Sequence, residues 1–218
     1  MQFEKTGAVD ESAETAQLLA RAAAGDREAL DDLFARHQER LWRMVRLRLN
    51  RRLQGRVDET DVVQEAFVEA SRRLGEFLDN PQAPFFLWLR QLTLFKLSDV
   101  HRTHFGATMR DANRDVSIYS GAMPEGTSES LAAQLLATLT SPSQAAVRIE
   151  KQMRVQEALD KLSPVDREIL TLRHLEELSN LEAAQVLGMS PSGTTARHVR
   201  ALKRLRALLE EMPGFFDN

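Results

Sequence analysis

Basic residues gather on two short stretches of a chain that is slightly acidic overall. Residues 197–206 hold five arginines or lysines and one histidine, and residues 40–56 hold seven arginines and no acid, although the formal net charge is −3. Cationic side chains at this density bind phosphate, because each contact releases counterions from a nucleic acid. The first stretch therefore favours a DNA-binding helix, with a merely solvated helix as the alternative on charge alone.

A polar group with helical spacing lies between these two basic stretches, in the second quarter of the chain. Asp61, Gln64 and Glu65 stand at positions i, i+3 and i+4, which share one face of a helix, and Val63 and Phe67 lie on its apolar side. On spacing alone, an ordinary amphipathic helix with a polar outer side is the favoured explanation.

No motif in the chain predicts an enzyme. The sequence has no cysteine, glycine-rich phosphate loop or nucleophile elbow. Asp99, His101 and His104 are the nearest approach to a metal site, but a lone HxxH pair is a weak signal. We predict no catalytic residue, metal or cofactor. An acidic N-terminus without an apolar segment, and the lack of any long apolar run, predict a soluble cytoplasmic protein that does not enter the membrane.

Helical periodicity accounts for most of the chain and predicts an all-α fold. Residues 106–130 have weak periodicity and are rich in Gly, Ser, Thr and Asn. This segment predicts a flexible linker between two small helical domains. The first half is predicted as helices over 26–49, 61–74 and 84–104, with a Gly- and Pro-containing loop at 74–84 and the linker at 106–141.

Three serines predict three helix starts in the last third of the chain. Ser163 and Ser190 each precede a proline, and Ser179 begins a capping box with Glu182. Gly188 stands where a left-handed C-cap is needed. The resulting helices, over 164–176, 180–187 and 191–211, are typical of a helix-turn-helix, whose second helix enters the major groove.

The last helix is expected to place its apolar and polar residues on different sides. Its predicted inward stripe consists of Val199, Leu202, Leu205 and Leu209. The candidate DNA contacts on its other faces are Thr195, Arg197, His198, Arg200, Lys203 and Arg204.

Both halves of the chain resemble bacterial RNA polymerase sigma factors of the sigma-70 family. ALDKLSPVDREILTLRHLEELSNLEAAQVLGMSPSGTTARHVRALKRLR is similar to the region-four domain that binds the −35 promoter element. DETDVVQEAFVEASRRL, followed by FFLWLRQLTLFKLSDVHR, is similar to the region-two domain. The absence of an intervening third domain is typical of the extracytoplasmic-function (ECF) type. The resemblance covers nearly all of residues 18–209 except the linker.

The resemblance implies a sigma factor that binds core RNA polymerase and directs it to promoters. Such a protein recognises the −35 and −10 elements and helps to melt the DNA for transcription initiation. The implied domains are an acidic tail at 1–14, a region-two domain at 15–105, the linker at 106–141 and a region-four helix-turn-helix domain at 142–212. Family members are commonly held inactive by an anti-sigma factor, which is a further expected partner.

The resemblance also assigns roles to individual residues. Asp61, Gln64 and Glu65 match the face that docks on the clamp helices of the largest polymerase subunit. The −10 contacts are expected at Trp88, Arg90, Lys96 and Arg102, although Trp88 also suits a core position. Arg197 and Arg200 are expected to be the main −35 contacts.

Two residues depart from the usual family pattern. Phe95 stands where members usually have Asn, and Thr195 stands where they usually have Lys, so the promoter preference of the family does not transfer. The alternative function is a dimeric helix-turn-helix regulator that binds an operator without core polymerase, with residues 15–104 as a sensor or dimerisation domain. Dependence on Asp61 and Glu65 for polymerase binding separates the two functions.

Overall fold

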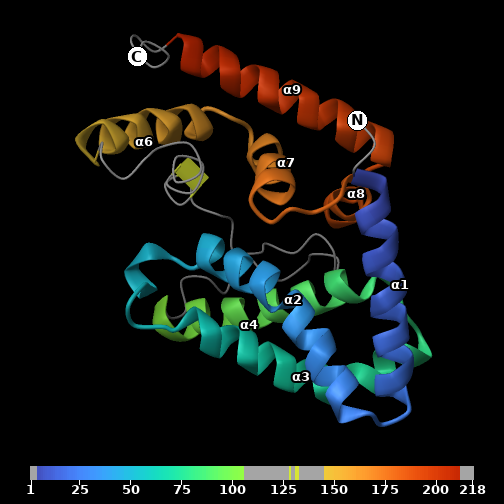
Figure 1. Cartoon of the computed structure of the whole chain (residues 1–218). Helices are drawn as coiled ribbons and strands as arrows, with labels where there is room; N and C mark the ends of the chain where they lie inside the picture. The colour runs from blue at the N-terminus through green and yellow to red at the C-terminus, as the bar shows by residue number, and fades with distance from the viewer. Residues whose placement is uncertain (1–3, 106–127, 129–130, 133–144, 212–218) are drawn as a thin grey trace.

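The computed structural model describes residues 4–105, 128, 131–132 and 145–211, and all of its regular elements are helical. Figure 1 shows two groups of helices, α1 to α4 in one and α6 to α9 in the other, with α9 along the outer side of the second. The helices are α1 (Glu4–Ala23), α2 (Arg27–Arg48), α3 (Glu59–Asp79), α4 (Phe85–Phe105), α6 (Ala145–Asp160), α7 (Pro164–His174), α8 (Asn180–Leu187) and α9 (Pro191–Glu210), with a 3-10 turn at Arg51–Leu53.

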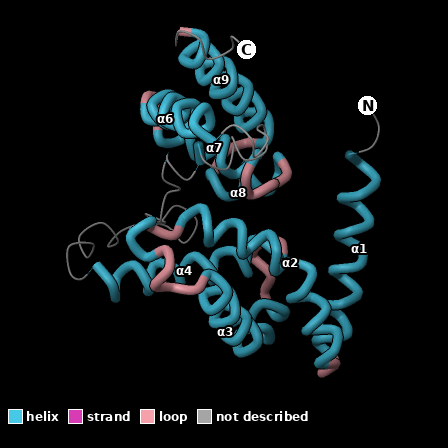
Figure 2. Tube along the Cα trace, turned by 60° about the vertical axis from the view of Figure 1, so that its left-hand side comes forward, coloured by secondary structure: helices cyan, strands magenta, loops and turns pink. Residues whose placement is uncertain are grey.

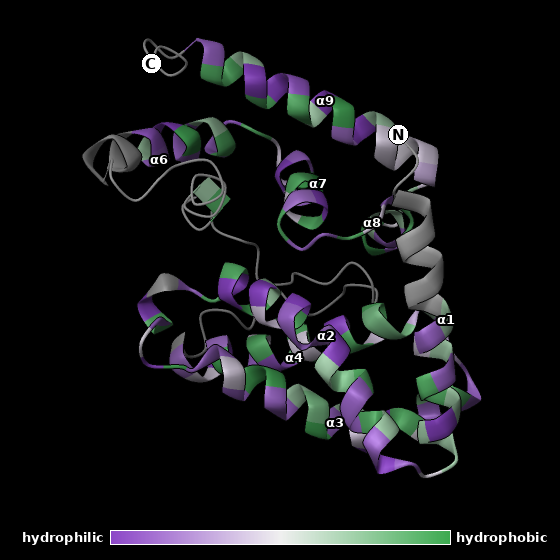
Figure 3. Cartoon of the chain, viewed as in Figure 1, coloured by the Kyte–Doolittle hydropathy of each residue, from purple (hydrophilic) through white to green (hydrophobic). Residues whose placement is uncertain are grey.

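The first group of helices is closed by aliphatic and aromatic packing. Leu33 and Leu41 of α2, Val62 of α3 and Leu89 and Leu97 of α4 are almost completely buried. Figure 3 shows that hydrophobic and hydrophilic residues occupy different sides of these helices. Helices α2 and α3 thus bury an apolar stripe and leave a polar side outward, whereas residues 85–94 of α4 are buried or half-buried on all sides.

Helix α3 is longer than the sequence predicts. It continues through Gly75 to Asp79, so the loop predicted at 74–84 is confined to residues 80–84. The added turn carries Phe77, whose ring stacks on Trp88 of α4 with 4.6 Å between centroids. This burial compensates for the weak helix propensity of glycine.

Helix α1 begins at Glu4, inside the segment predicted as an acidic tail, and continues without a break across position 14. Leu18, Leu19 and Ala22 pack against the first core, and α2 starts directly afterwards at Asp26. The Asp26 carboxylate accepts a hydrogen bond from the Ala29 amide at 3.1 Å, which fixes the start of α2.

The predicted caps of the second group are confirmed. Ser163 and Ser190 accept hydrogen bonds from amides three residues on, and Ser179 forms the full capping box with Glu182. Gly188 is left-handed, with φ of 62°, and ends α8. The tight turn that separates α8 from α9 therefore follows from local signals in the sequence.

The inward face of α9 differs from the prediction. Val199 and Leu202 are exposed, and the buried residues are Thr194 and Ala201, which lie about two helical turns apart. Small side chains face α7 and α8 because these short helices cross α9 closely. Leu205 and Leu209 do pack against the second core, as predicted.

Part of the predicted linker belongs to the second core. Leu131 and Ala132 are buried there with Leu159 and Ile169. The Ser128 hydroxyl lies 3.0 Å from an Arg167 guanidinium nitrogen, within hydrogen-bonding distance. The rest of the predicted 106–141 linker lies outside the described residues.

Candidate protein and nucleic-acid interfaces

The outer face of α9 combines exposed basic and small side chains. Thr195, Val199, Arg200 and Lys203 recur at helical spacing on this face, and Val199 is 43% exposed. Arg200, Lys203 and Arg204 are exposed and form no ion pair with any other residue that the structure describes. An unpaired basic stripe with a methyl-bearing centre can contact phosphates and a thymine methyl in a major groove. Sequence reasoning missed Val199 because leucine periodicity assigned it to the core.

Arg197 faces inward rather than toward the basic stripe. Its Nε donates to Asp166 Oδ1 at 2.9 Å, and its Nη2 lies 3.4 Å from Ser163 Oγ. Because the guanidinium is half-buried and bound to the start of α7, its predicted part as a main DNA contact is not supported by this geometry. Its observed interactions hold α9 against α7.

His198 is also turned toward the domain. Its Nε2 lies 2.8 Å from Nε2 of His174 on α7, so one ring donates and the other accepts. Burial, followed by the charge of Arg173, lowers the pKa of His174. Burial and the neighbouring His174 lower the pKa of His198 as well, which favours a neutral pair at pH 7.

The four predicted −10 residues on α4 do not share one surface. Trp88 is half-buried and its ring stacks on Phe77. This packing supports the alternative that Trp88 belongs to the core. Lys96 is half-buried, and Arg102 is exposed and paired with Asp99 at 2.5 Å. Arg90 is only 5% exposed. In this conformation its guanidinium therefore does not reach the surface, and its assignment as a DNA-backbone contact stays a prediction.

An exposed aromatic ring on α4 was not among the predicted contacts. Phe95 is 47% exposed and lies between Gln91 and Asp99 at intervals of one helical turn, with Arg102 one turn further on. An exposed ring next to a cation can stack on an unpaired base while the cation meets the phosphate. Its exposure is what makes Phe95 a candidate for such a contact, and the sequence alone does not show which residues are exposed.

Arg90 is bound to an acidic residue of the second helical group. Its Nε lies 2.8 Å from Glu176 Oε2, and Arg48 Nε lies 2.7 Å from Glu176 Oε1. Arg48 Nη2 also lies 2.5 Å from Glu168 Oε1. Burial alone raises the pKa of the Glu176 carboxyl, but the charges of Arg48 and Arg90 outweigh burial and hold that pKa below its usual range. No sequence pattern indicated this cluster.

The predicted protein-binding face on α3 is solvent-exposed. Asp61, Gln64 and Glu65 all lie on the outer side of the helix, while Val63 is buried on the inner side. Val68, one turn further on, is 52% exposed and adds an apolar residue to the face. A polar face with one apolar residue at its edge is well suited to a protein partner.

His101 has a structural role in this fold. Its Nε2 accepts a hydrogen bond from the Asn50 amide at 3.2 Å and is buried. Within the described ranges, no group of three or more His, Asp or Glu side chains is arranged to hold a metal ion. Across the same ranges, none of the helices has the length and apolar character needed to cross a membrane.

Comparison with family models matches both halves of the chain. A model described as "ECF sigma factor" matches residues 12–114, and one described as "Sigma-70, region 4" matches residues 152–205. The two matches lie in the order that the sequence predicts, on the first and second helical groups. A dimeric regulator is not favoured, because both halves match sigma factor regions.

Curated relatives and a solved structure give the same result over nearly the full length. The chain is 33% identical over 204 residues to the ECF RNA polymerase sigma factor ShbA of Streptomyces griseus, covering 93% of this chain and 98% of that protein. It is 33% identical to the RNA polymerase sigma factor CnrH of Cupriavidus metallidurans over 88% of this chain and 93% of that one. The structure of CnrH in complex with the cytosolic domain of CnrY aligns with a TM-score of 0.53 at 29% identity, covering 91% of this chain and 98% of that one.

Proposed function

The chain belongs to the extracytoplasmic-function family of sigma factors and directs core RNA polymerase to promoters, and we propose that α9, α4 and α3 divide this work. In this assignment α9 reads the −35 element, α4 receives the −10 element, and α3 docks on the clamp helices of the largest polymerase subunit. The region-two role falls to residues 15–105 and the region-four role to residues 142–212.

The observation that carries the proposal is the exposed, unpaired basic stripe on α9 within a helix-turn-helix. Arg200, Lys203 and Arg204 are exposed, Gly188 sets the turn, and Ser190 fixes the start of the helix. We assign the −35 phosphate contacts to the three basic residues and the base contacts to Thr195 and Val199. Arg197 and His198 then position the helix from behind.

Helix α4 is assigned to the melted −10 strand through Phe95, with Lys96 and Arg102 as phosphate contacts. Phe95 exposes a large part of its ring, whereas the ring of Trp88 stacks on Phe77. Stacking on an aromatic ring is worth about 1–3 kcal/mol per base. Melting would therefore draw on binding free energy within the polymerase complex, without a catalytic step by this chain.

Two partners and a compartment complete the assignment. Core polymerase would bind the α3 face of Asp61, Gln64 and Glu65. CnrH is solved with the cytosolic domain of CnrY, and by analogy an anti-sigma protein is proposed to bind this chain. Because polymerase and promoters lie in the cytoplasm, the chain is proposed to work there.

Run-off transcription with core polymerase on a genomic promoter library tests the function and the specificity together. We expect transcripts from a set of start sites that share −35 and −10 sequences and that depend on adding the chain. A control reaction lacks the chain and contains only core polymerase. Transcription unchanged by the chain on every promoter would overturn the proposed function.

A further inference from the structure

Two neighbouring residues of α9 are attached to different ends of α7. Arg197 Nε donates to Asp166 Oδ1, in the first turn of α7, at 2.9 Å. His198 Nε2 lies 2.8 Å from Nε2 of His174, which is the last residue of α7. Asp166 and His174 are eight positions apart, so the attachments lie about 12 Å apart along α7, at about 1.5 Å per residue. Figure 2 shows α7 beneath α9, and the two attachments together fix the angle at which the helices cross.

The two imidazole rings meet head to head. Their centroids lie 4.9 Å apart, well beyond the 2.8 Å between the Nε2 atoms, so the two nitrogens lie between the rings and point toward each other. A hydrogen bond between them needs one Nε2–H donor and one unprotonated Nε2 acceptor, so the two neutral rings must hold different tautomers. The attachment of His198 to His174 therefore exists only while one proton, and not two, lies between the rings.

A proton fits between these nitrogens, and a metal ion does not. Bonds from zinc to imidazole nitrogen are about 2.0–2.1 Å long, so an ion on the line between the two atoms would need them roughly 4 Å apart. Among the residues that the structure describes, no third His, Asp or Glu side chain is placed to complete a metal site with them. The pair therefore acts through its hydrogen bond.

The surroundings of the pair oppose its protonation. Partial burial, followed by the charge of Arg173, lowers the pKa of His174, and partial burial, followed by the charges of His174 and Arg173, lowers the pKa of His198. Helix α6 places the apolar residues Val155 and Leu159 in the core that it shares with α9. The other charged groups of α7, α8 and the loop between them have partners elsewhere, including Asp166 with Arg197, Arg167 with Asp160, Glu168 with Arg48, Glu176 with Arg90, Glu177 with Arg43 and Glu182 with Arg40. Both rings are therefore neutral at pH 7 and take up protons only below about pH 6.5.

The proposed DNA-reading residues lie directly beside this attachment on α9. Thr195 and Val199 are exposed, while His198 is half-buried between the outer and inner faces. If the attachment of His198 were lost, α9 could pivot about the remaining bond of Arg197 and move these two side chains in the groove. Contacts to base edges need placement to within about 0.5 Å, whereas long basic side chains can follow a phosphate. A pivot of α9 would therefore weaken base recognition more than phosphate binding.

We propose that His174 and His198 are positioning residues for the −35 contact, and that the proton they share holds α9 at the angle that base recognition requires. Neither ring touches DNA in this assignment, because both act through the placement of Thr195 and Val199. The inference rests on the proposed function of α9 for its consequence, but the histidine pair itself is a property of the free chain.

Acid should release this attachment in two steps. A first added proton is held on Nδ1 of the donor ring and leaves the hydrogen bond in place. A second added proton puts N–H groups on both facing nitrogens and brings two positive rings together, so the bond is lost. Because both pKa values are lowered, discrimination between the correct and a wrong −35 sequence should be complete above about pH 6.5 and fall as the pH drops below it.

Nitrogen-15 NMR of the imidazole rings observes the pair in the free full-length chain. At pH 7.5 we expect one of the two rings to carry its proton on Nε2 and the other on Nδ1. Replacing either histidine by glutamine should change the titration of the remaining one. The same tautomer in both rings, or titrations that do not depend on each other, would overturn the shared proton whatever the chain does in transcription.

Sequence discrimination by the holoenzyme measures the positioning role. The readout is the ratio of affinities for a promoter from the run-off screen and for the same promoter with its −35 element replaced, at pH 7.5 and pH 5.0. His198→Leu removes the hydrogen bond and keeps an apolar side chain. It should lower the ratio at pH 7.5 by about three- to tenfold, the effect of one lost hydrogen bond, and abolish its pH dependence. His198→Gln has an amide that can donate to His174 or accept from it, so it should keep the wild-type ratio at both pH values.

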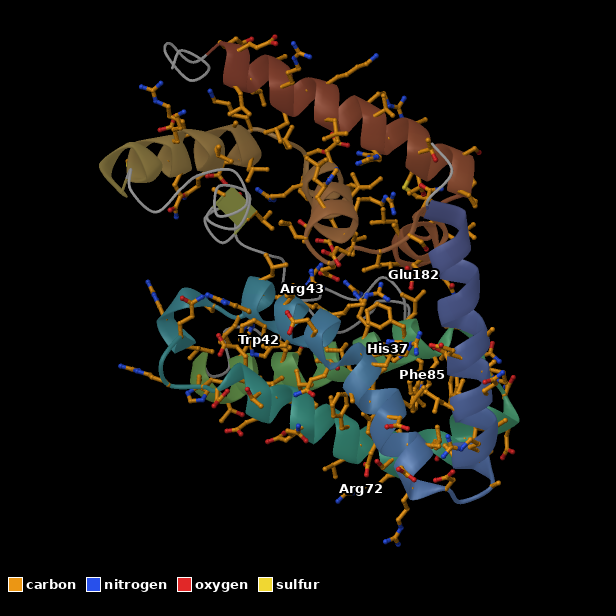
Figure 4. All side chains as sticks on the ribbon, viewed as in Figure 1. His37, Trp42, Arg43, Arg72, Phe85 and Glu182 are labelled. Carbon is orange, nitrogen blue, oxygen red and sulfur yellow. The ribbon has the colours of Figure 1, made fainter. Side chains whose placement is uncertain are left out.

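His37→Leu is the matched control, because it removes a buried histidine with a lowered pKa from the other group of helices. Figure 4 shows His37 on α2, in the group that does not contain α9. This variant should keep the wild-type ratio and its pH dependence.

The ratio separates positioning from a loss of folded protein, since misfolding weakens binding to both promoters equally. An unchanged ratio for His198→Leu, or a His198→Gln variant as poor as His198→Leu, would overturn the positioning role. A wild-type ratio that is equal at the two pH values would overturn the part of the shared proton. A chain that shows the two tautomers but directs no transcription in the run-off screen would instead contradict the proposed function.

Discussion

Arg197 Nε and Asp166 Oδ1 lie 2.9 Å apart, which makes the first basic residue of the α9 cluster a link between α9 and α7. The arginines three and seven positions later behave differently: Arg200 and Arg204 are exposed and have no ion-pair partner among the described residues. The positive charges on α9 thus divide into an inner residue that supports the domain and outer residues that are available to DNA.

Substituting inner and outer residues should give different defects in a holoenzyme that binds −35 DNA. Arg200→Ala and Lys203→Ala should each weaken binding and reduce the salt slope by about 1, the signature of a lost phosphate contact. Arg197→Ala should leave the slope unchanged and lower the free energy of unfolding by about 1–2 kcal/mol, because it removes a partly buried charged hydrogen bond. Salt titrations of binding and urea denaturation measure the two effects. A reduced salt slope for Arg197→Ala at normal stability would contradict this division.

The helix starts could be predicted because they depend on neighbouring residues. The surroundings of Arg90 and Phe95 could not, because they depend on residues far away in the sequence. Ser163, Ser179 and Ser190 cap their own helices, so their roles can be predicted from a few neighbouring residues. The family resemblance predicts Arg90 as a DNA contact, but its observed partner Glu176 lies 86 residues away, and no local pattern relates the two residues. The exposure of Phe95 likewise depends on which helices leave it uncovered.

The inner face of α9 shows that hydrophobic periodicity alone does not identify which residues of a helix are buried. Leucine spacing selected Val199 and Leu202, but Thr194 and Ala201 are the residues buried there. A long helix crossed by two short ones is covered only where they touch it, and close crossings select small side chains. Apolar residues beside the crossing remain exposed, which places Val199 on the proposed DNA-binding face.

The exposed face of α3 should control polymerase binding. Asp61→Ala with Glu65→Ala should weaken binding to core polymerase by at least about tenfold, which corresponds to about 1.4 kcal/mol, while the melting temperature stays near that of the wild type. Asp31→Ala with Asp32→Ala is the matched control, because it removes two exposed carboxylates from α2 and changes the net charge equally. Fluorescence anisotropy with labelled protein measures the affinity. Equal affinities for the two double variants would assign docking to another surface.

Phe95 should act in promoter melting rather than in initial binding. Phe95→Ala should lower open-complex formation by roughly tenfold or more, since one base–aromatic stack is worth about 1–3 kcal/mol, while closed-complex affinity changes little. Phe95→Tyr keeps the ring and should retain most of the activity. Permanganate reactivity of unpaired thymines in the −10 region reports melting directly. Met153→Ala, at an exposed apolar residue in the other domain, is the control. A defect in Phe95→Tyr as large as in Phe95→Ala would exclude stacking.

His37 should make the fold sensitive to mild acid. Its ring contacts the rings of Phe85 and Phe86, and neither ring nitrogen has a partner among the described residues. Burial, followed by the charges of Arg40 and Arg36, lowers the pKa of His37 to about 4. The unfolded chain therefore takes up a proton first as the pH falls below about 6.5, and the folded state loses stability until about pH 4.

The size of this effect is measurable by urea denaturation at several pH values. Between pH 7.5 and 5, the His37 contribution to the free energy of unfolding should fall by about 2 kcal/mol, at about 1.4 kcal/mol per pKa unit. His101, His174 and His198 also have lowered pKa values and act in the same direction, so the comparison needs a difference between proteins. His37→Leu keeps the apolar packing and should flatten the curve by that amount. Parallel stability curves for wild type and His37→Leu would show that His37 is protonated equally in the folded and unfolded chains.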